Sequence, residues 1–294
     1  MKDKKIDKRE NLRVVTDNRI IEAQDLPKLS LNAKKLFFIA VAQCRRNDTT
    51  FYEYETTPIE LAEMWGVSRQ DVYSLADKIT TELMKIVITL PNGEKGFKKR
   101  HLFEKCDYDD DSVLTFKLHS EMTDLLLGLK KNFSKPLVWD FMKMKSPYSM
   151  AIWHLFQREM KSFKPMINSP IEFEISLDDL RKVTGLETKF NGISEFKRFV
   201  LDKAIAEIKR NCLTDITYVN IKRGRTVIGF RFTAKSIFEL DAENLSYRTR
   251  LKLRKADLAR KEADGTLTFD EQDELNELRK YLSQMTLEDY SAEV

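Results

Sequence analysis

The sequence predicts an α+β fold: two tandem winged helix-turn-helix domains related by an internal repeat, then a charged C-terminal tail that is helical or partly disordered. Three observations predict it. A stretch of the first half recurs in the second half, both copies carry matching helix caps, and each continues into a second amphipathic helix and a pair of strands. The chain has 294 residues, 42% of them hydrophobic, which is enough for two packed domains.

The repeat aligns YETTPIELAEMWGV (54–67) with FEISLDDLRKVTGL (173–186). A constant shift of 119 positions pairs Thr57 with Ser176 and Gly66 with Gly185. Threonine and serine cap helix N-termini, and glycine suits a left-handed helix end. Thr57 is also followed by a proline and, three positions on, by a glutamate, the pattern of a capping box. Each copy therefore predicts a short helix, and the alternating residues before each cap predict short strands at 51–55 and 171–175.

A longer helix is predicted after each short one. In the first copy it covers 68–86, with Ser68 as its cap and Asp71 at the third helical position. In the second copy it covers 195–210, and the turn before it has six extra residues around ETKFNGI. Apolar residues recur at helical spacing in both copies: Val72, Leu75, Ile79, Leu83 and Ile86 in the first, and Phe196, Val200, Ala204 or Ile205, and Ile208 in the second.

Strands are predicted after each long helix. They are KIVITL (85–90), FKKRHLFEKC (97–106) and VLTFKLH (113–119) in the first copy, and DITYVNI (215–221) and TVIGFRFTA (226–234) in the second. The order strand, capped helix, turn, second helix and β-hairpin is that of a winged helix. Such modules place their second helix in the major groove of double-stranded DNA.

The other segments fit around these units. A leading helix is predicted over 29–46, and a second one over 146–163, where Ser146 and Pro147 form its start. Residues 244–283 predict two charged helices broken at Asp264 and Gly265. The predicted division is an N-terminal arm (1–25), a first domain (26–133), a linker or short connecting elements (134–145), a second domain (146–240) and the tail (241–294).

The net charge of +4 is unevenly distributed. Residues 241–294 hold nine Lys and Arg against thirteen Asp and Glu, so residues 1–240 carry an excess of eight positive charges. A basic body suits a polyanionic partner, although ordinary surface charge explains it equally well. No apolar run reaches the length of a membrane span, the N-terminus lacks a secretory signal, and the three scattered cysteines suit a reducing cytoplasm.

The candidate DNA-binding residues lie on the second helices and on the turns of the hairpins, where cations can neutralise phosphates and helix N-termini can reach base edges. In the first domain they are Ser68, Arg69, Gln70, Tyr73, Lys98, Lys99 and Arg100; in the second they are Lys189, Asn191, Lys197, Arg198, Lys203, Lys209, Arg210, Lys222, Arg223 and Arg225. For each of these residues taken singly, the alternative is that it is an ordinary exposed helix residue. The apolar residues Phe190, Phe196, Phe199, Trp153 and Phe156 are expected in the core rather than against bases.

A search for catalytic groups favours a binding protein over an enzyme. His101, His119 and His154 are isolated from one another in sequence and from the cysteines, so no zinc spacing is found. No phosphate-binding GxxxxGK[ST] loop is present, and Asp109, with the two aspartates after it, suits a polar turn between strands better than a cation site. No cofactor and no metal are expected.

A specific pattern covers residues 196–232 and has two parts: a basic helix ending in VL-x-x-A-x-x-EI, and a strand pair around K-x-GR-x-V-x-GF-x-F. It resembles the second winged helix of initiator Rep proteins of iteron-type, theta-replicating plasmids. The segments KSPYSMAIWHLF and LSLNAKKLFFIAVAQ resemble helices that open the family's two domains. The likeness covers about residues 20–240 and leaves the tail unmatched. The motif residues are Val200, Leu201, Ala204, Glu207, Ile208, Lys222, Gly224, Arg225, Val227, Gly229, Phe230 and Phe232.

The resemblance implies a mechanism. Monomers would bind directly repeated origin sites, the iterons, which favours opening of nearby AT-rich DNA and recruits the host initiator and replicative helicase. Homodimers, in equilibrium with monomers, would form through the first domain, bind an operator inverted repeat and repress the protein's own gene. The charged tail and the acidic turn near Asp109 depart from the family pattern.

Two other classes stay open. A transcription regulator could use the same two domains on a promoter without supporting replication. A rolling-circle nicking endonuclease would need a clustered histidine pair for its metal and a nucleophilic tyrosine, and the sequence places no two histidines close together along the chain.

Overall fold

The computed structural model describes residues 4–5, 12–45, 47–93, 95–109, 113–160, 170–212, 214–236, 247–266, 272, 275–276 and 279. It divides into two compact units: residues 1–164 with 169–235, and residues 165–168 with 236–294. Both winged helices belong to the first unit. Most of the predicted N-terminal arm before residue 12, and the predicted tail at 237–246 and beyond 279, lie outside the described residues.

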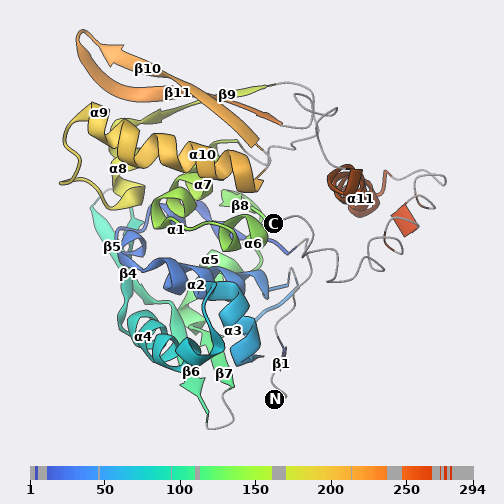
Figure 1. Cartoon of the computed structure of the whole chain (residues 1–294). Coiled ribbons are helices and arrows are strands. Elements are labelled where there is room, and N and C mark those ends of the chain that lie inside the picture. The colour runs from blue at the N-terminus through green and yellow to red at the C-terminus, as the bar shows by residue number, and fades with distance from the viewer. Residues whose placement is uncertain are drawn as a thin grey trace. The chain divides into compact units, whose positions relative to one another are not determined.

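The first winged helix follows the predicted order (Figure 1). Its sheet has the order β1-β3-β7-β6, and a separate two-stranded hairpin, β4-β5, forms the first wing. Its elements are β1 (Lys4–Lys5), α2 (Leu31–Ala42), β3 (Tyr54–Thr56), α3 (Pro58–Trp65), α4 (Val72–Lys85), β4 (Val87–Asn92), β5 (Gly96–His101), β6 (Phe103–Tyr108) and β7 (Leu114–Leu118).

The second winged helix packs a three-stranded sheet, order β10-β11-β9, over its helices. β9 and β11 run antiparallel, with Phe173 opposite Phe232 and Ile175 opposite Phe230. These side chains are buried and form an aromatic core with Phe156. Its elements are α7 (Pro147–Glu159), β9 (Ile171–Ser176), α8 (Leu177–Thr184), α9 (Ile193–Phe196), a π-helical segment (Lys197–Leu201), α10 (Asp202–Cys212), β10 (Thr214–Arg223) and β11 (Thr226–Ser236).

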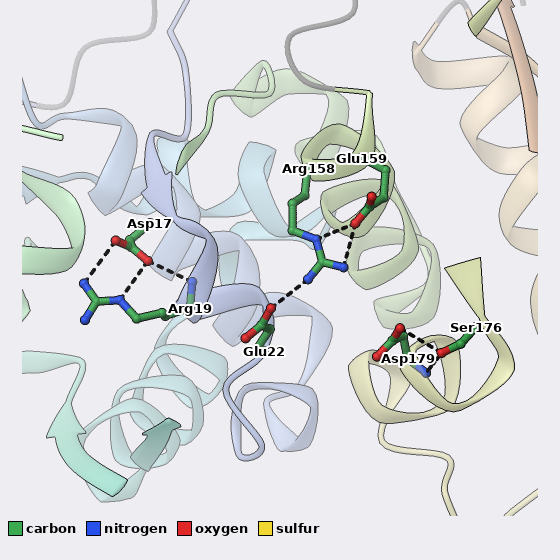
Figure 2. A network of polar contacts seen from close by, with 7 residues as sticks. All are labelled: Asp17, Arg19, Glu22, Arg158, Glu159, Ser176 and Asp179. Carbon is green, nitrogen blue, oxygen red and sulfur yellow. Dashed lines mark hydrogen bonds and ion pairs between the residues drawn. The ribbon is translucent and has the colours of Figure 1, made fainter. Parts of the chain in front are cut away.

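The predicted caps are confirmed in both copies. Thr57 and Glu60 form a full capping box at the start of α3. The hydroxyl of Ser176 accepts the backbone N–H of Asp179 and donates to its carboxylate at 2.7 Å (Figure 2). Gly66 and Gly185 end α3 and α8 with φ values of 68° and 67°, a conformation that glycine adopts without the strain of a side chain.

Three predicted elements differ in the structure. Residues 97–106 form two strands instead of one, because Leu102 turns into the core between β5, which pairs with β4, and β6, which pairs with β7. Ser68 opens a 3-10 turn (Arg69–Asp71) instead of capping α4, since its hydroxyl is engaged by the Asp71 carboxylate. The second long helix contains a π-helical segment, which turns the adjacent Val200 and Leu201 both inward.

The segments flanking the first winged helix pack into the same unit. β2 (Thr16–Asp17), in the predicted arm, pairs with β8 (Phe133–Ser134), at the boundary of the predicted first domain and linker, in one small two-stranded sheet. The linker also contains α6 (Val138–Met142), which packs against α2 and α10. The bounds of the remaining elements are α1 (Asn18–Ile21), a 3-10 turn (Leu26–Lys28), another 3-10 turn (Ser120–Met122) and α5 (Thr123–Leu126).

Helix α2, within the predicted leading helix, is buried on all sides. Its residues from Ala33 to Ala42 are all buried, including Lys34 and Lys35. Each lysine amine donates to a backbone carbonyl, Lys34 to Pro27 and Lys35 to Met64. Burial lowers the pKa of Lys34 to about 8. The predicted core positions of Trp153 and Phe156 on α7 are also confirmed.

Polar contacts join α7 to the turn after α1. Arg158 on α7 donates to the Glu22 carboxylate at 3.0 Å and forms an ion pair with Glu159 (Figure 2). Asp17 accepts three hydrogen bonds from the backbone and guanidinium of Arg19 at the start of α1. These bonds complete the junction at which the first domain meets α7.

The second unit contains helix α11 (Tyr247–Ala263). The helix ends at Ala263, and Gly265 follows with a φ of 66°, so the predicted break at Asp264-Gly265 is confirmed. Beyond it, the buried Leu275 packs with Leu258, and Arg279 forms an ion pair with Glu262 at 2.6 Å. Among the helices that the structure describes, none is long and apolar enough to cross a membrane.

His154 is a buried histidine at the centre of the junction. Its side chain is 2% exposed, and its Nε2 lies 2.9 Å from the Thr16 hydroxyl and 3.0 Å from that of Ser134. The rings of Phe38 and Phe141 meet it edge to face. Burial, with a smaller effect of Arg158, lowers the pKa of the imidazole from 6.5 to about 3.

This pKa predicts a loss of stability in acid. Below pH 6.5 the unfolded chain takes up a proton at His154 that the folded protein does not, so stability falls as the pH drops from 6.5 toward 3. His154→Gln removes that titration. The free energy of unfolding of wild type minus that of the variant should shrink by about 1.4 kcal/mol for each pH unit below 6.5.

Urea denaturation between pH 7 and pH 5 measures the difference. His101→Gln, on the exposed end of β5, is the control for a general effect of losing an imidazole. A difference between wild type and His154→Gln that stays constant over this range would contradict the assignment.

Candidate nucleic-acid interface

The second long helix of each domain begins at a turn that presents polar side chains to solvent. In the first domain, Ser68, Arg69 and Gln70 are exposed around the 3-10 turn. Tyr73, the second residue of α4, is 69% exposed, with its ring edge-on to Tyr108 at 5.6 Å between centroids. The structure therefore brings these four predicted residues together at the N-terminus of α4.

The first wing presents two of its three predicted cations. Lys98 and Lys99 are exposed on β5, next to Phe97, which is 64% exposed. Arg100 is half-buried, and its guanidinium donates to the carbonyls of Lys99 and Glu121. Arg100 is thus held against the base of the wing, whereas the two lysines point outward.

The second domain gathers its cations at one end of the helix-turn-helix. Lys189 and Asn191 are exposed in the turn between α8 and α9, which we define as residues 186–192 and call the α8–α9 turn. Arg198 is exposed on the π-helical segment and Lys203 on α10. In Figure 1, α9 and the tip of the β10–β11 hairpin both lie toward the left edge of the view, as does the β4–β5 hairpin.

The second wing carries its cations on a two-residue turn. β10 ends at Arg223 and β11 begins at Thr226, so Gly224 and Arg225 make the turn. Gly224 has a φ of 62°, and a side chain there would be strained. Lys222, Arg223 and Arg225 are all exposed, which is the geometry for contacts with phosphates.

Three other predicted residues are placed differently. Lys197 is half-buried, with its amine 5.1 Å from the Tyr218 ring and 3.4 Å from the Asn220 side chain, so it joins the helix to β10. Lys209 forms an ion pair with Asp215 at 2.9 Å. Lys209 and Arg210 also lie about 16 Å along the helix from Arg198. The structure does not bring these two together with the α8–α9 turn.

The predicted core position of Phe199 is wrong. Phe196 is fully buried and Phe190 is half-buried, but Phe199 is 42% exposed. The π-helical segment that turns Val200 and Leu201 into the core leaves Phe199 on the outer side. Simple helical periodicity does not anticipate this, because it assumes a constant 3.6 residues per turn.

Sequence reasoning missed Arg181, which fixes the α8–α9 turn. This side chain is 9% exposed, and its guanidinium lies 5.0 Å from the Phe196 ring centroid. It donates hydrogen bonds to four carbonyls of the turn: those of Leu186 at 3.1 Å, Lys189 at 2.8 Å, Phe190 at 2.7 Å and Asn191 at 3.3 Å. One residue therefore satisfies most of the acceptors in the segment that presents Lys189 and Asn191.

The turn needs such support because it is longer and strained. Phe190 has a φ of 51°, a left-handed conformation that costs a bulky residue about 1 kcal/mol or more. The first copy has a turn six residues shorter, and Ala62 stands where the second copy has Arg181. The replacement of Ala62 by Arg181 between the two copies, together with the six extra residues, was the sequence signal that pointed to a role for Arg181.

The histidines are less isolated than the sequence suggested. The rings of His101 and His119 lie 5.9 Å apart at the base of the first wing. The Nδ1 of His119 accepts the backbone N–H of Glu121 at 3.2 Å. Within the described residues, no group of three or more His, Cys, Asp or Glu is arranged to hold a metal ion.

Two family models match the two winged helices. Residues 13–157 match the first winged helix of initiator replication proteins, and residues 176–234 match the second winged helix of initiator Rep proteins. The chain belongs to the initiator replication protein family. The first match includes residues 13–25, whose strand β2 pairs with β8, and it extends through residues 134–157, so it counts most of α7 with the first winged helix. The tail lies outside both matches.

Two curated relatives from Escherichia coli are similar over part of the chain. The PI protein is 32% identical over 120 residues, which are 36% of this chain and 37% of the relative. A replication initiation protein is 27% identical over 184 residues, 62% of this chain and 54% of the relative. The matches thus span between about a third and about half of the relatives' length.

The fold is similar to that of a solved complex. The crystal structure of the Pi initiator protein in complex with iteron DNA gives a TM-score of 0.64 at 19% identity. It covers 78% of this chain and 98% of the solved chain. At this identity the likeness shows that the tandem winged-helix fold is shared.

The Arg181 contacts predict a local loss of order when the guanidinium is removed. Arg181→Met should lower the free energy of unfolding by about 2–3 kcal/mol, because four hydrogen bonds from a charged group are lost. The backbone amides of residues 186–192 should also exchange faster with solvent. Urea denaturation and hydrogen exchange measure the two effects.

Lys182→Met, at an exposed neighbouring position of α8, is the matched control and should change neither quantity. Unchanged exchange at 186–192 in Arg181→Met would show that the turn holds its shape without this residue.

Proposed function

We propose that this chain is a plasmid replication initiator that binds directly repeated sites, iterons, in double-stranded DNA. The observation that carries the proposal is the gathering of exposed cations on the α8–α9 turn, the start of the second long helix and the second wing of a family member. Helix-turn-helix modules insert that helix into the major groove, and wings lie along the phosphates. The basic excess of residues 1–240 supplies the attraction to DNA.

The contacts divide into two kinds in this proposal. Lys189, Asn191 and Arg198 face base edges, where an Arg or Lys paired with guanine or an Asn paired with adenine discriminates by about 1–3 kcal/mol. Lys222, Arg223 and Arg225 neutralise phosphates. In the first domain, Arg69 and Gln70 read a further part of each repeat while Lys98 and Lys99 contact its backbone.

In this proposal, replication initiation and its regulation proceed as in the other members of the family. Monomers bound to iterons favour opening of adjacent AT-rich DNA and recruit the host initiator and replicative helicase. Dimers form through the first domain, bind an inverted repeat and repress the initiator's own gene. The family membership supports these steps, whereas the residues that contact host proteins or a second copy are unassigned.

We further propose that the chain acts by binding alone. Burial raises the pKa of the thiols of Cys44 and Cys106 to about 12, so both stay protonated near neutral pH and are poor nucleophiles. His154 is enclosed in the core. Within the described residues, the His101–His119 pair belongs to no group of three or more His, Cys, Asp or Glu arranged to hold a metal ion, which argues against a metal-dependent nicking centre there.

Footprinting on the DNA that flanks the gene tests the proposal. The expected result is protection of several direct repeats, since an initiator fills an array of sites. A lone protected palindrome would instead support the transcription regulator, which uses the same domains on a promoter.

The same DNA, supercoiled and incubated with Mg²⁺, tests the non-enzymatic part. The DNA should remain supercoiled. A relaxed product with covalently attached protein would contradict binding alone and establish a nicking enzyme.

Arg225 should contribute to affinity without contributing to specificity. Arg225→Ala removes one phosphate contact, so it should weaken binding to every sequence alike and reduce the slope of log K against log salt by about one unit. The measurement is a salt titration by fluorescence anisotropy on repeat and non-repeat duplexes.

Arg231→Ala is the matched control on β11, the strand that follows the turn, because Arg231 is already paired with Glu174 at 2.7 Å. An unchanged slope for Arg225→Ala would remove Arg225 from the interface.

A further inference from the structure

Phe199 is an exposed aromatic ring among residues that face solvent at the start of the second long helix. Its neighbours in sequence, Val200 and Leu201, are 1% and 0% exposed, whereas Phe199 is 42% exposed. It stands in the π-helical segment, and such interruptions of α-helices often occur at functional sites. A large apolar side chain left outside a packed core is informative when it lies where a partner is expected.

Two cations lie against this ring. The guanidinium carbon of Arg198 is 5.2 Å from the ring centroid, and the amine of Lys203 is 5.6 Å from it. The ring of Phe190, in the α8–α9 turn, is 6.0 Å away on the side of the protein. Phe199 is therefore an apolar surface between two positive charges, supported from behind by the turn that Arg181 holds.

This arrangement fits one surface of double-stranded DNA. In the major groove, the 5-methyl group of thymine is the apolar feature of the base edges, and phenylalanine is a side chain that contacts it. The flanking cations suit the phosphates on either side. A protein partner would have to desolvate both charges to cover the ring, which is costly without carboxylates opposite them.

We propose that Phe199 contacts the 5-methyl group of a thymine and so determines specificity at that base pair. This proposal rests on the DNA binding proposed above and names one base that the protein contacts. The contact is absent from the first domain, where Ser74 occupies the position that matches Phe199 in the repeat.

Uracil interference tests the contact. The probe is the footprinted flanking duplex with deoxyuridine replacing a small fraction of thymidines, so that each molecule lacks a few methyl groups. For the wild-type protein, uracil in place of one or two thymines of each repeat should reduce the binding affinity about fourfold. This factor corresponds to the free energy gained by burying one methyl group. For Phe199→Ala, interference at those thymines should disappear, and affinity for the unmodified duplex should fall by a similar factor.

The matched control is Phe97→Ala, which removes a ring that is 64% exposed and 5.6 Å from the amine of Lys99, but on the first wing. It should keep the wild-type interference pattern. Phe199→Leu, which retains an apolar side chain, should keep part of the effect. Thermal unfolding of the three variants checks that each is folded.

The outcomes separate the two proposals. A wild-type footprint with the same interference pattern in Phe199→Ala would overturn the thymine contact and leave the DNA binding intact. The absence of any protected repeat for the wild-type protein would overturn both.

Discussion

The buried guanidinium of Arg181 holds the α8–α9 turn, the segment of the second domain that presents exposed polar residues. Arg181 bonds to four carbonyls of the α8–α9 turn and stacks on Phe196, so the turn is fixed both to α8 and to the helix that follows. Lys189 and Asn191 depend on it directly, and Phe190, which supports Phe199, depends on it through its carbonyl. Without that guanidinium, a strained turn with a left-handed Phe190 would lose the donor to the carbonyls of Lys189, Phe190 and Asn191.

The two winged helices share a plan but differ in how their surfaces are built. The first has a short turn and a wing whose Arg100 is held by backbone carbonyls. The second has a longer turn and a wing with three exposed cations. Its second long helix also carries the exposed ring of Phe199, which lies between two further cations. Because the cost of ordering a surface falls when it is fixed before binding, we infer that the second domain supplies more of the discrimination between sequences.

The sequence predicted those features of the fold that depend on interactions between residues close together in the chain. The caps at Thr57 and Ser176, the glycine helix ends and the order of the elements follow from residue preferences within a few positions. The exposure of Phe199, the turn of the chain at Leu102 and the four bonds of Arg181 depend on neighbours brought together by the fold. The proximity of His101 and His119 likewise arises from the fold, because the backbone N–H of His119 donates to the carbonyl of Leu102, the residue after His101, at 3.0 Å.

We propose that the α8–α9 turn and the helix after it contact the bases of DNA, with the second wing on the backbone. Hydrogen–deuterium exchange of the full chain, with and without the footprinted repeat duplex, measures where DNA lies on the protein. Protection on binding should be strongest in residues 186–203 and 222–226, and weaker in 68–73 and 95–100. Protection confined to the first domain or to α11, with no change in 186–203, would contradict it.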